Sequence, residues 1–298
     1  MIPLVFHPIY SILDLPVRHR FPIQKYQAIY DALRQFGVAE SSFQQPEAVN
    51  VERLKSVLNP LYVQQLTTGT LDAKAMRRIG FPWSEQLITR TLTAVGGTIL
   101  TSQLALESGK AINLTGGYHH AFANFGSGFC MVNDLYLSAL NMLQNPSVDR
   151  ILIFDCDVHQ GDGTAKLAER NANVKTVSIH GEKNFPHRKQ VSDYDFPLPK
   201  GTSDEVYLDT VDCALNLAVN NFQPDAVIYD AGVDIHEDDD LGHLCISTQG
   251  VYARDKMVFD LCEHKGLPVA AVIGGGYQRD IDALVKVHLQ LFRAAGVY

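Results

Sequence analysis

The chain has 298 residues, 46% of them hydrophobic and 19% charged, which is ordinary for a globular protein of one large or two small domains. Its net charge of −8 and pI of about 5.7 argue against direct binding of nucleic acid, because phosphate binding needs a basic face. The N-terminus resembles neither a signal peptide nor a membrane span, and the five cysteines are scattered without a CxxC pair. We therefore expect a cytoplasmic protein without disulfides or membrane contact.

Short apolar runs alternate with segments of helical spacing along the whole chain. In chain order, strands are expected at residues 4–7, 111–114, 151–154, 174–180, 224–229 and 268–273, and helices at 23–36, 46–58, 85–107, 133–143, 162–169, 203–220, 248–265 and 280–295. This alternation predicts an α/β protein with a mostly parallel sheet and helices on both faces. Because no linker or repeat interrupts it, residues 1–298 are expected to form one domain, with a split near residue 145 as the alternative. The pair Gly96-Gly97 inside a predicted helix indicates either close packing or a break.

Polar residues gather directly after the predicted strands. Asp155, Asp157 and His159 alternate after a buried apolar run, so their side chains project to one side of extended chain. The other clusters, each after its own strand, are His119-His120, His180, Asp234 and Tyr277. Because the carboxyl ends of parallel strands meet at one edge of the sheet, we expect these side chains to converge there.

Two carboxylates and an imidazole at such an edge form a candidate metal site. A hydrolytic Zn²⁺ takes three protein ligands and leaves one position open, and Asp157, His159 and Asp234 could supply the three.

Further residues at this edge could supply acid–base chemistry. His119 and His120 could act as base and acid, and carboxylates such as Asp155 and Asp162 could fix their tautomers. Tyr277 could donate a hydrogen bond to a developing oxyanion.

Each of these features also has an ordinary structural interpretation. An Asp at a strand end often caps a helix, and a single His is often only a core residue. The acidic run Glu237-Asp238-Asp239-Asp240 could be a solvated face. Gly274-Gly275-Gly276 lacks the Lys-Ser/Thr of a phosphate-binding loop, so that interpretation is poor. The coincidence of all the clusters at strand ends favours the metal site.

The clusters form short motifs that resemble those of the histone deacetylase superfamily, which includes acetoin-utilisation proteins and acetylpolyamine amidohydrolases. In family order over residues 115–278, they are Gly116-Gly117-Tyr118-His119-His120, Gly128-Phe129-Cys130, Asp155-Cys156-Asp157-Val158-His159 with Gly161-Asp162-Gly163, Ala231-Gly232-Val233-Asp234, and Gly274-Gly275-Gly276-Tyr277. The stretch from Asp234 to Gly242, with Tyr277-Gln278 near the C-terminus, most resembles the class IV type.

The resemblance implies the arginase–deacetylase fold, a single domain with a central sheet of about eight strands. It implies one Zn²⁺ per chain, or Fe²⁺ in its place, held by Asp157, His159 and Asp234. It also implies that His119 and His120, paired with Asp155 and Asp162, act on the attacking water and the leaving amine, while Tyr277 polarises the acyl carbonyl.

A substrate tunnel and a second cation are implied by the same resemblance. The tunnel would be walled by Gly128, Phe129, Phe185 and Gly275, with Leu241 at its mouth. Such apolar walls suit the methylenes of a lysine side chain. A structural K⁺ would be held, partly through backbone carbonyls, by Asp155, Asp157, His159, Ser178 and Ile179.

The chain departs from class I lysine deacetylases at one position. Those enzymes carry an Asp before the long helix, where it grips the substrate backbone. Counting back from Gly96-Gly97 places that position at or near Phe81, and no carboxylate stands there.

We therefore expect a zinc-dependent amidohydrolase that removes an acetyl or longer acyl group from the ε-amine of lysine. One alternative is an acetylpolyamine or other small acyl-amine amidohydrolase, since the acidic run near Asp234 would suit a polycation. An alternative of another class is a non-catalytic acyl-lysine binding module. An arginase-like ureohydrolase would need two Mn²⁺ and more carboxylate ligands. The expected partner is thus an acylated lysine or a small acyl-amine.

Overall fold

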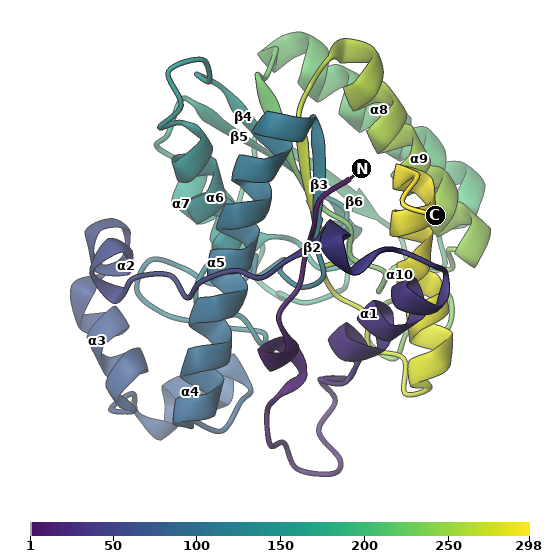
Figure 1. The fold of residues 1–298 in the computed structure, drawn as a ribbon. Helices are drawn as coiled ribbons and strands as arrows, with labels where there is room; N and C mark the ends of the chain where they lie inside the picture. The colour runs from purple at the N-terminus through teal and green to yellow at the C-terminus, as the bar shows by residue number, and fades with distance from the viewer. Residues whose placement is uncertain (1) are drawn as a thin grey trace.

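Apolar runs that are buried on both faces build the central sheet. In the computed structural model, which describes residues 2–298, these runs form one parallel sheet of eight strands in the order β2-β1-β3-β8-β7-β4-β5-β6 (Figure 1). The strands are β1 (Leu4–Val5), β2 (Phe43–Gln44), β3 (Lys110–Asn113), β4 (Ile151–Asp155), β5 (Val174–Gly181), β6 (Tyr194–Leu198), β7 (Ala226–Asp230) and β8 (Val269–Val272). Every residue of β4, β7 and β8 is buried, as expected where helices cover both faces.

Helices cover both faces of this sheet. They are α1 (Lys25–Gln35), α2 (Val51–Val57), α3 (Pro60–Thr68), α4 (Ala73–Ile79), α5 (Glu85–Ser108), α6 (Asp134–Met142), α7 (Asp162–Ala168), α8 (Asp204–Phe222), α9 (Thr248–Lys265) and α10 (Ile281–Ala295). On one face, α5 crosses β3 and β8 and α6 lies beside it (Figure 1). On the other face, α8 packs on β4, β5 and β6, and α9, α10 and α1 follow in turn. This is the arginase–deacetylase arrangement that the resemblance implies.

The long helix α5 passes through Gly96-Gly97 without a break. A Cβ on Gly96 would lie 1.9 Å from the Glu47 carbonyl oxygen, and one on Gly97 would lie 2.1 Å from the Tyr10 hydroxyl. The two glycines therefore allow close packing, and the alternative of a break is wrong.

The six predicted strands are present, but two strands and two helices were not predicted. The edge strand β6 contains Pro197, which an edge tolerates, and β2 is only two residues long. The helix expected at 46–58 begins at Val51, capped by the Asn50 side chain. The Asn59 side chain caps α3, one of the two unpredicted helices, and α4 follows it.

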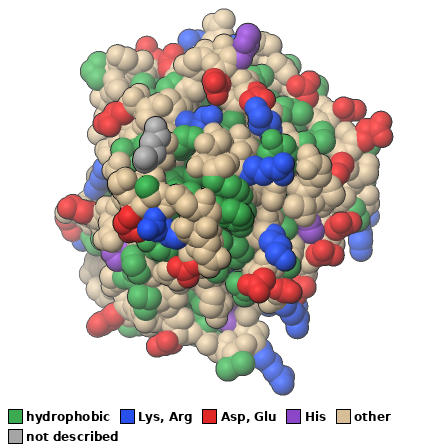
Figure 2. Space-filling view, turned by 45° about the vertical axis from the view of Figure 1, so that its right-hand side comes forward, with side chains coloured by type: hydrophobic (Ala, Val, Ile, Leu, Met, Phe, Trp, Pro, Cys, Tyr) green, Lys and Arg blue, Asp and Glu red, His purple; other side chains and the backbone are tan. Residues whose placement is uncertain are grey.

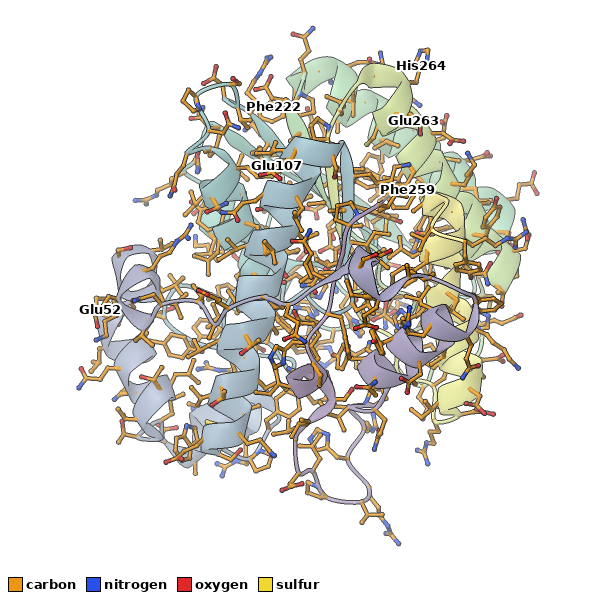
Figure 3. The ribbon with its side chains drawn as sticks, in the orientation of Figure 1. Glu52, Glu107, Phe222, Phe259, Glu263 and His264 are labelled. Atoms are coloured by element: carbon orange, nitrogen blue, oxygen red, sulfur yellow. The ribbon has the colours of Figure 1, made fainter. Side chains whose placement is uncertain are left out.

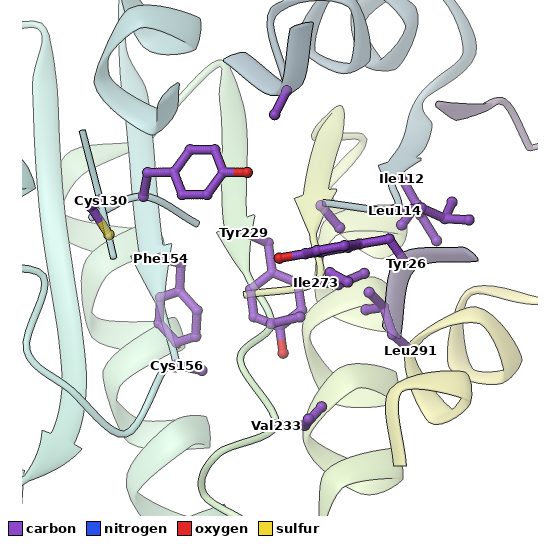
Figure 4. Packing of buried hydrophobic residues seen from close by; sticks show 14 of the residues in the cluster. Tyr26, Ile112, Leu114, Cys130, Phe154, Cys156, Tyr229, Val233, Ile273 and Leu291 are labelled. Atoms are coloured by element: carbon purple, nitrogen blue, oxygen red, sulfur yellow. The ribbon is translucent and has the colours of Figure 1, made fainter. Parts of the chain in front are cut away.

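The core beneath the sheet edge consists of aromatic and branched side chains. Phe154 and Tyr229 lie on adjacent strands with ring centroids 6.3 Å apart, and Tyr26 of α1 lies near Ile112 and Leu114 (Figure 4). The carboxyl ends of β3, β4, β7 and β8 all point away from the end of the molecule where α5 and α9 terminate, marked by Glu107 and His264 in Figure 3. The loops that follow these strands consequently emerge together.

The surface mixes charges of both signs. Figure 2 shows acidic and basic side chains interspersed over one face. Among the described residues, no helix is both long and apolar enough to cross a membrane.

Candidate active site

The histidine pair after β3 is held by a buried carboxylate at the start of α6. The turn Gly116-Gly117 has φ of 101° and 87°, a conformation that glycine adopts without strain. Asp134 accepts hydrogen bonds from the N–H groups of Gly117 (3.1 Å) and Tyr118 (2.7 Å). These bonds fix the loop that ends in His119-His120.

Each of the two histidines is paired with its own carboxylate. His119 Nδ1 lies 2.7 Å from Asp155, and His120 Nδ1 lies 2.7 Å from Asp162. The two rings are tilted by 51° to each other at a centroid distance of 4.1 Å, and both are buried. Because each Nδ1 faces a carboxylate, each Nε2 is left for other partners, and that of His119 lies 3.8 Å from Asp157.

The two imidazoles differ in acidity because their surroundings differ. Burial lowers the pKa of His119, but the charges of Asp155 and Asp157 outweigh burial and raise this pKa well above 6.5. Burial and the charge of His119 lower the pKa of His120 to about 4. The surroundings thus favour a protonated His119 and a neutral His120, which is the kind of contrast that acid–base chemistry uses.

A second cluster, next to the histidine pair, brings together the predicted metal ligands. Asp157, His159 and Asp234 each offer a ligand atom, and these atoms lie within 4.8 Å of one another. His159 Nδ1 is 2.9 Å from Asp157 and 3.1 Å from Asp234. The second carboxylate oxygens accept bonds from the N–H groups of Gly275 and Val158, both at 2.9 Å, which orients the carboxylates.

The chemistry of this cluster fits a divalent metal. Imidazole nitrogen and carboxylate oxygen are donors that Zn²⁺ binds, and Fe²⁺ accepts the same donors. Burial and then the charge of Asp157 raise the pKa of Asp234 to about 7, so a bound cation would relieve the crowding of negative charge. A Cβ on Gly275 would lie 2.2 Å from Asp234 Oδ2, so only glycine leaves this space free.

Aromatic rings wall the approach to both clusters. The Phe185 ring meets the His120 ring edge-on at 4.8 Å, and the Phe129 ring lies 6.0 Å from that of Tyr277. Gly128 packs against the His120 ring, where a Cβ would lie 2.7 Å from Cδ2. Leu241 is half-buried, and its carbonyl accepts a bond from Asn184, the neighbour of Phe185. Gly128 and Phe185 therefore lie against His120, and Phe129 lies near Tyr277, while the tunnel itself stays a prediction.

The residues predicted to hold K⁺ lie at the adjoining ends of β4 and β5. Ser178 is the register partner of Asp155, and Ile179 follows it in a buried position. His180, singled out with the strand-end residues, bonds to the Ser178 hydroxyl at 3.0 Å and belongs to neither cluster.

Comparison with known proteins establishes the family. Residues 19–292 match the family model described as the histone deacetylase domain. The chain belongs to the histone deacetylase superfamily. Family members hydrolyse amide bonds as deacetylases, and the family is typically metal-dependent.

Individual relatives cover much of the chain. An uncharacterized protein of Picosynechococcus sp. is 47% identical over 98% of both chains. Histone deacetylase 2 of Arabidopsis thaliana is 37% identical over 68% of this chain and 53% of its own length. The acetoin utilization protein AcuC of Bacillus subtilis is 28% identical over 92% of this chain and 76% of its own. The structure of an HDAC homologue from Aquifex aeolicus matches with a TM-score of 0.83 at 22% identity, over 99% of this chain and 84% of that one, and shares the fold.

The site contains a further buried carboxylate, Asp230, that was not predicted. Asp230 ends β7 opposite Asp155, and its Oδ2 lies 3.9 Å from His119 Nδ1. It has no exposed surface, and neither of its carboxylate oxygens has a hydrogen-bond partner among the described residues. Burial and the charge of Asp155 raise its pKa well above the usual value. The sequence could have revealed Asp230 through its position directly after the strand expected at residues 224–229.

A buried lysine was also missed. Lys25 of α1 donates to the carbonyl of Gly274 at 3.0 Å and approaches that of Gly276 at 3.5 Å. Burial lowers the pKa of Lys25 to about 8. Lys25 thus supports the glycine turn that carries Tyr277. This contact joins residues 249 positions apart, so no local sequence pattern predicts it.

The position where class I enzymes place an Asp is occupied by a core residue. Phe81 is buried, stacks on His19 at 5.4 Å and meets Phe21 edge-on at 4.9 Å. An aromatic cluster therefore stands where the resemblance led us to look for a carboxylate.

Proposed function

We propose that this deacetylase-family protein is a zinc-dependent amidohydrolase that removes an acyl group from the ε-amine of lysine. The observation that carries the proposal is the adjacency of two histidine–carboxylate pairs to a three-ligand cluster at the end of an aromatic-walled approach. Residues 1–298 act as a single catalytic domain in this proposal.

Asp157, His159 and Asp234 would hold the metal. When bound, Zn²⁺ or Fe²⁺ supplies a Lewis acid and lowers the pKa of water. The proposed K⁺ between β4 and β5 would have a structural role only, beside Ser178 and Ile179.

The remaining site residues move the protons. His120 is neutral at pH 7, so its Nε2 can take a proton from the attacking water and pass it to the leaving amine. The charges of Asp155 and Asp157 favour the protonated form of His119, which would offset the negative charge that develops on the substrate. Asp155 and Asp162 hold the two tautomers.

Tyr277 is the donor for the acyl oxygen. Its backbone N–H bonds to Asp239 at 2.7 Å, and its ring packs near Phe129, so the side chain is well fixed. Among the described residues, nothing hydrogen-bonds to its hydroxyl, which leaves this group for the substrate.

The walls favour a long, thin alkyl chain. Phe129, Phe185 and the glycines at 128 and 275 would enclose the lysine methylenes, with Leu241 at the mouth. An HDAC homologue of the same fold was crystallised with SAHA (TM-score 0.84, 22% identity), which supports an acyl-amine ligand.

The acetylpolyamine alternative depends on the acidic run, half of which is used internally. Asp239 accepts bonds from the N–H groups of Leu241 and Tyr277, and Asp240 pairs with Arg279 at 2.7 Å. Only Glu237 and Asp238 are left for a polycation, so acyl-lysine is favoured. A pure binding module would not need two proton-transfer pairs.

Amine release from three substrates tests the proposal. The Zn²⁺-loaded protein is assayed with an acetyl-lysine peptide, a long-acyl-lysine peptide and N-acetylputrescine. We expect turnover of a lysine substrate, abolished in His120→Ala and unchanged in His264→Ala, a histidine at the opposite end of the molecule (Figure 3). Turnover of N-acetylputrescine alone would favour the polyamine alternative, and no turnover would refute the amidohydrolase.

A further inference from the structure

We propose that a groove beside the tunnel mouth binds an acidic, partly apolar segment next to the acyl-lysine of a protein substrate. This inference rests on the proposed function and adds the kind of sequence that the enzyme selects. The side groove has a volume of about 640 Å³ and is lined mainly by Phe122, Phe125, Phe185, Lys166, His187 and Arg188.

The side groove joins the catalytic centre directly. Phe185 lines the groove and also meets the His120 ring at 4.8 Å. Asp162, which also lines the groove, is the carboxylate bound to His120 at 2.7 Å. A chain whose acyl-lysine enters the tunnel therefore has its flanking residues beside this groove.

The rim of the side groove is basic. His187 and Arg188 are exposed, and neither forms an ion pair with any residue in the described range 2–298. Lys166 is exposed and pairs with Glu169, which lies outside the groove lining.

The groove lining has one carboxylate, Asp162, against the two cations Lys166 and Arg188. Asp162, the acidic residue in its lining, is only 7% exposed and is engaged by His120. In a chain of net charge −8, this local excess of positive charge selects an anionic partner and disfavours a cationic one.

The floor of the groove is aromatic and rigid. The Phe122 and Phe125 rings stack at 4.3 Å, and the Arg78 guanidinium lies over Phe125 at 4.1 Å. On the opposite wall, Lys189 fixes the segment around Phe185 by donating hydrogen bonds to the carbonyls of Asn184 and Pro186. A fixed apolar floor below a basic rim suits an Asp or Glu beside an apolar residue.

Acetyl-lysine peptides of equal length with acidic, neutral or basic flanks test the inference. We expect kcat/KM to be about 5-fold higher for acidic than for neutral flanks, a difference that falls as salt rises, because exposed charge pairs contribute little each and are screened. Arg188→Glu should reverse the order while leaving turnover of the neutral peptide within about twofold. The control Lys286→Glu makes the same charge change on the exposed side of α10 and should keep the order.

The outcomes separate the inference from the proposed function. If all peptides are turned over equally well, or if Arg188→Glu leaves the order of their kcat/KM values unchanged, the proposed role of the groove is wrong. The amidohydrolase function is then still supported. If no peptide is turned over, the proposed function fails, and fluorescence anisotropy of the labelled peptides still tests the groove. Equal binding of acidic and basic peptides would then overturn it, and tighter binding of acidic peptides, lost in Arg188→Glu, would support it.

Discussion

At the scale of single residues, the proposed role of the Tyr277 hydroxyl is the simplest to test by substitution. Tyr277→Phe keeps the ring that packs near Phe129 and the backbone bond to Asp239, so the fold should be intact. Removing one oxyanion donor lowers kcat by about 10²-fold or more. Steady-state kinetics checks this, with an unchanged melting temperature as the control, and near-normal turnover would exclude Tyr277 from the mechanism.

The burial of Asp230 should make the stability of the folded protein depend on pH. The pKa of Asp230 is higher in the folded protein than in the unfolded chain, where it is about 4. The folded protein is therefore most stable below pH 4 with respect to this group, and it loses that stability as the pH rises through the folded-state pKa. Asp230→Asn removes this titration, and the variant should therefore gain stability over the wild type as pH rises. Melting temperatures of the metal-free proteins from pH 5 to 8 measure the gap; a gap that is absent, or that shrinks with pH, contradicts the expectation.

At the scale of elements, α1 supports the turn after β8 through a single side chain. Lys25→Met keeps most of the buried volume but leaves the carbonyls of Gly274 and Gly276 without their donor. Each unsatisfied buried group costs about 1–3 kcal/mol, and the turn that carries Tyr277 should loosen. We expect a lower melting temperature and a kcat reduced by about tenfold with little change in KM.

A matched variant distinguishes this positioning role from general destabilisation. Lys286→Met removes an exposed lysine from α10, and it should change neither kcat nor melting temperature. Equal losses of kcat in the two variants, or full activity in Lys25→Met, would rule out a positioning role for Lys25.

The elements that sequence patterns predicted are those stabilised by their own apolar runs. The fully buried strands β4, β7 and β8 and the long helices were found because period and burial coincide. The helix α4 was missed although α2 and α7, which are also seven residues long, were found, so length alone does not explain the miss. The two-residue strand β2 was missed because it is defined only by its pairing with β1.

The candidate site divides in the same way. The strand-end residues Asp157, His159 and Asp234 could be predicted because parallel strands bring their ends to one edge, and the structure does bring them together. Lys25 and Asp134 could not, since each acts through a contact between distant segments. The fold is confirmed, whereas the roles of the site residues remain predictions.

At the scale of the whole molecule, metal binding should couple to stability. Asp157, His159 and Asp234 are buried together, so a bound cation should relieve repulsion between Asp157 and Asp234. We expect chelation to abolish turnover and lower the melting temperature, and Zn²⁺ or Fe²⁺ to restore both. Asp157→Ala should lose the metal-dependent rise in melting temperature; a wild type that is fully active after chelation would exclude the metal.

The proposed function requires that this site hydrolyse an acyl-lysine with one metal ion bound per chain. The direct measurement is free-amine release from an acetyl- or longer-acyl-lysine peptide by wild type and His120→Ala, with the metal content of both determined. We predict turnover by the wild type, loss of about 10²-fold or more in the variant, and one metal ion per chain in each. Equal rates in the two proteins, or no turnover by a wild type carrying one metal per chain, would contradict the account.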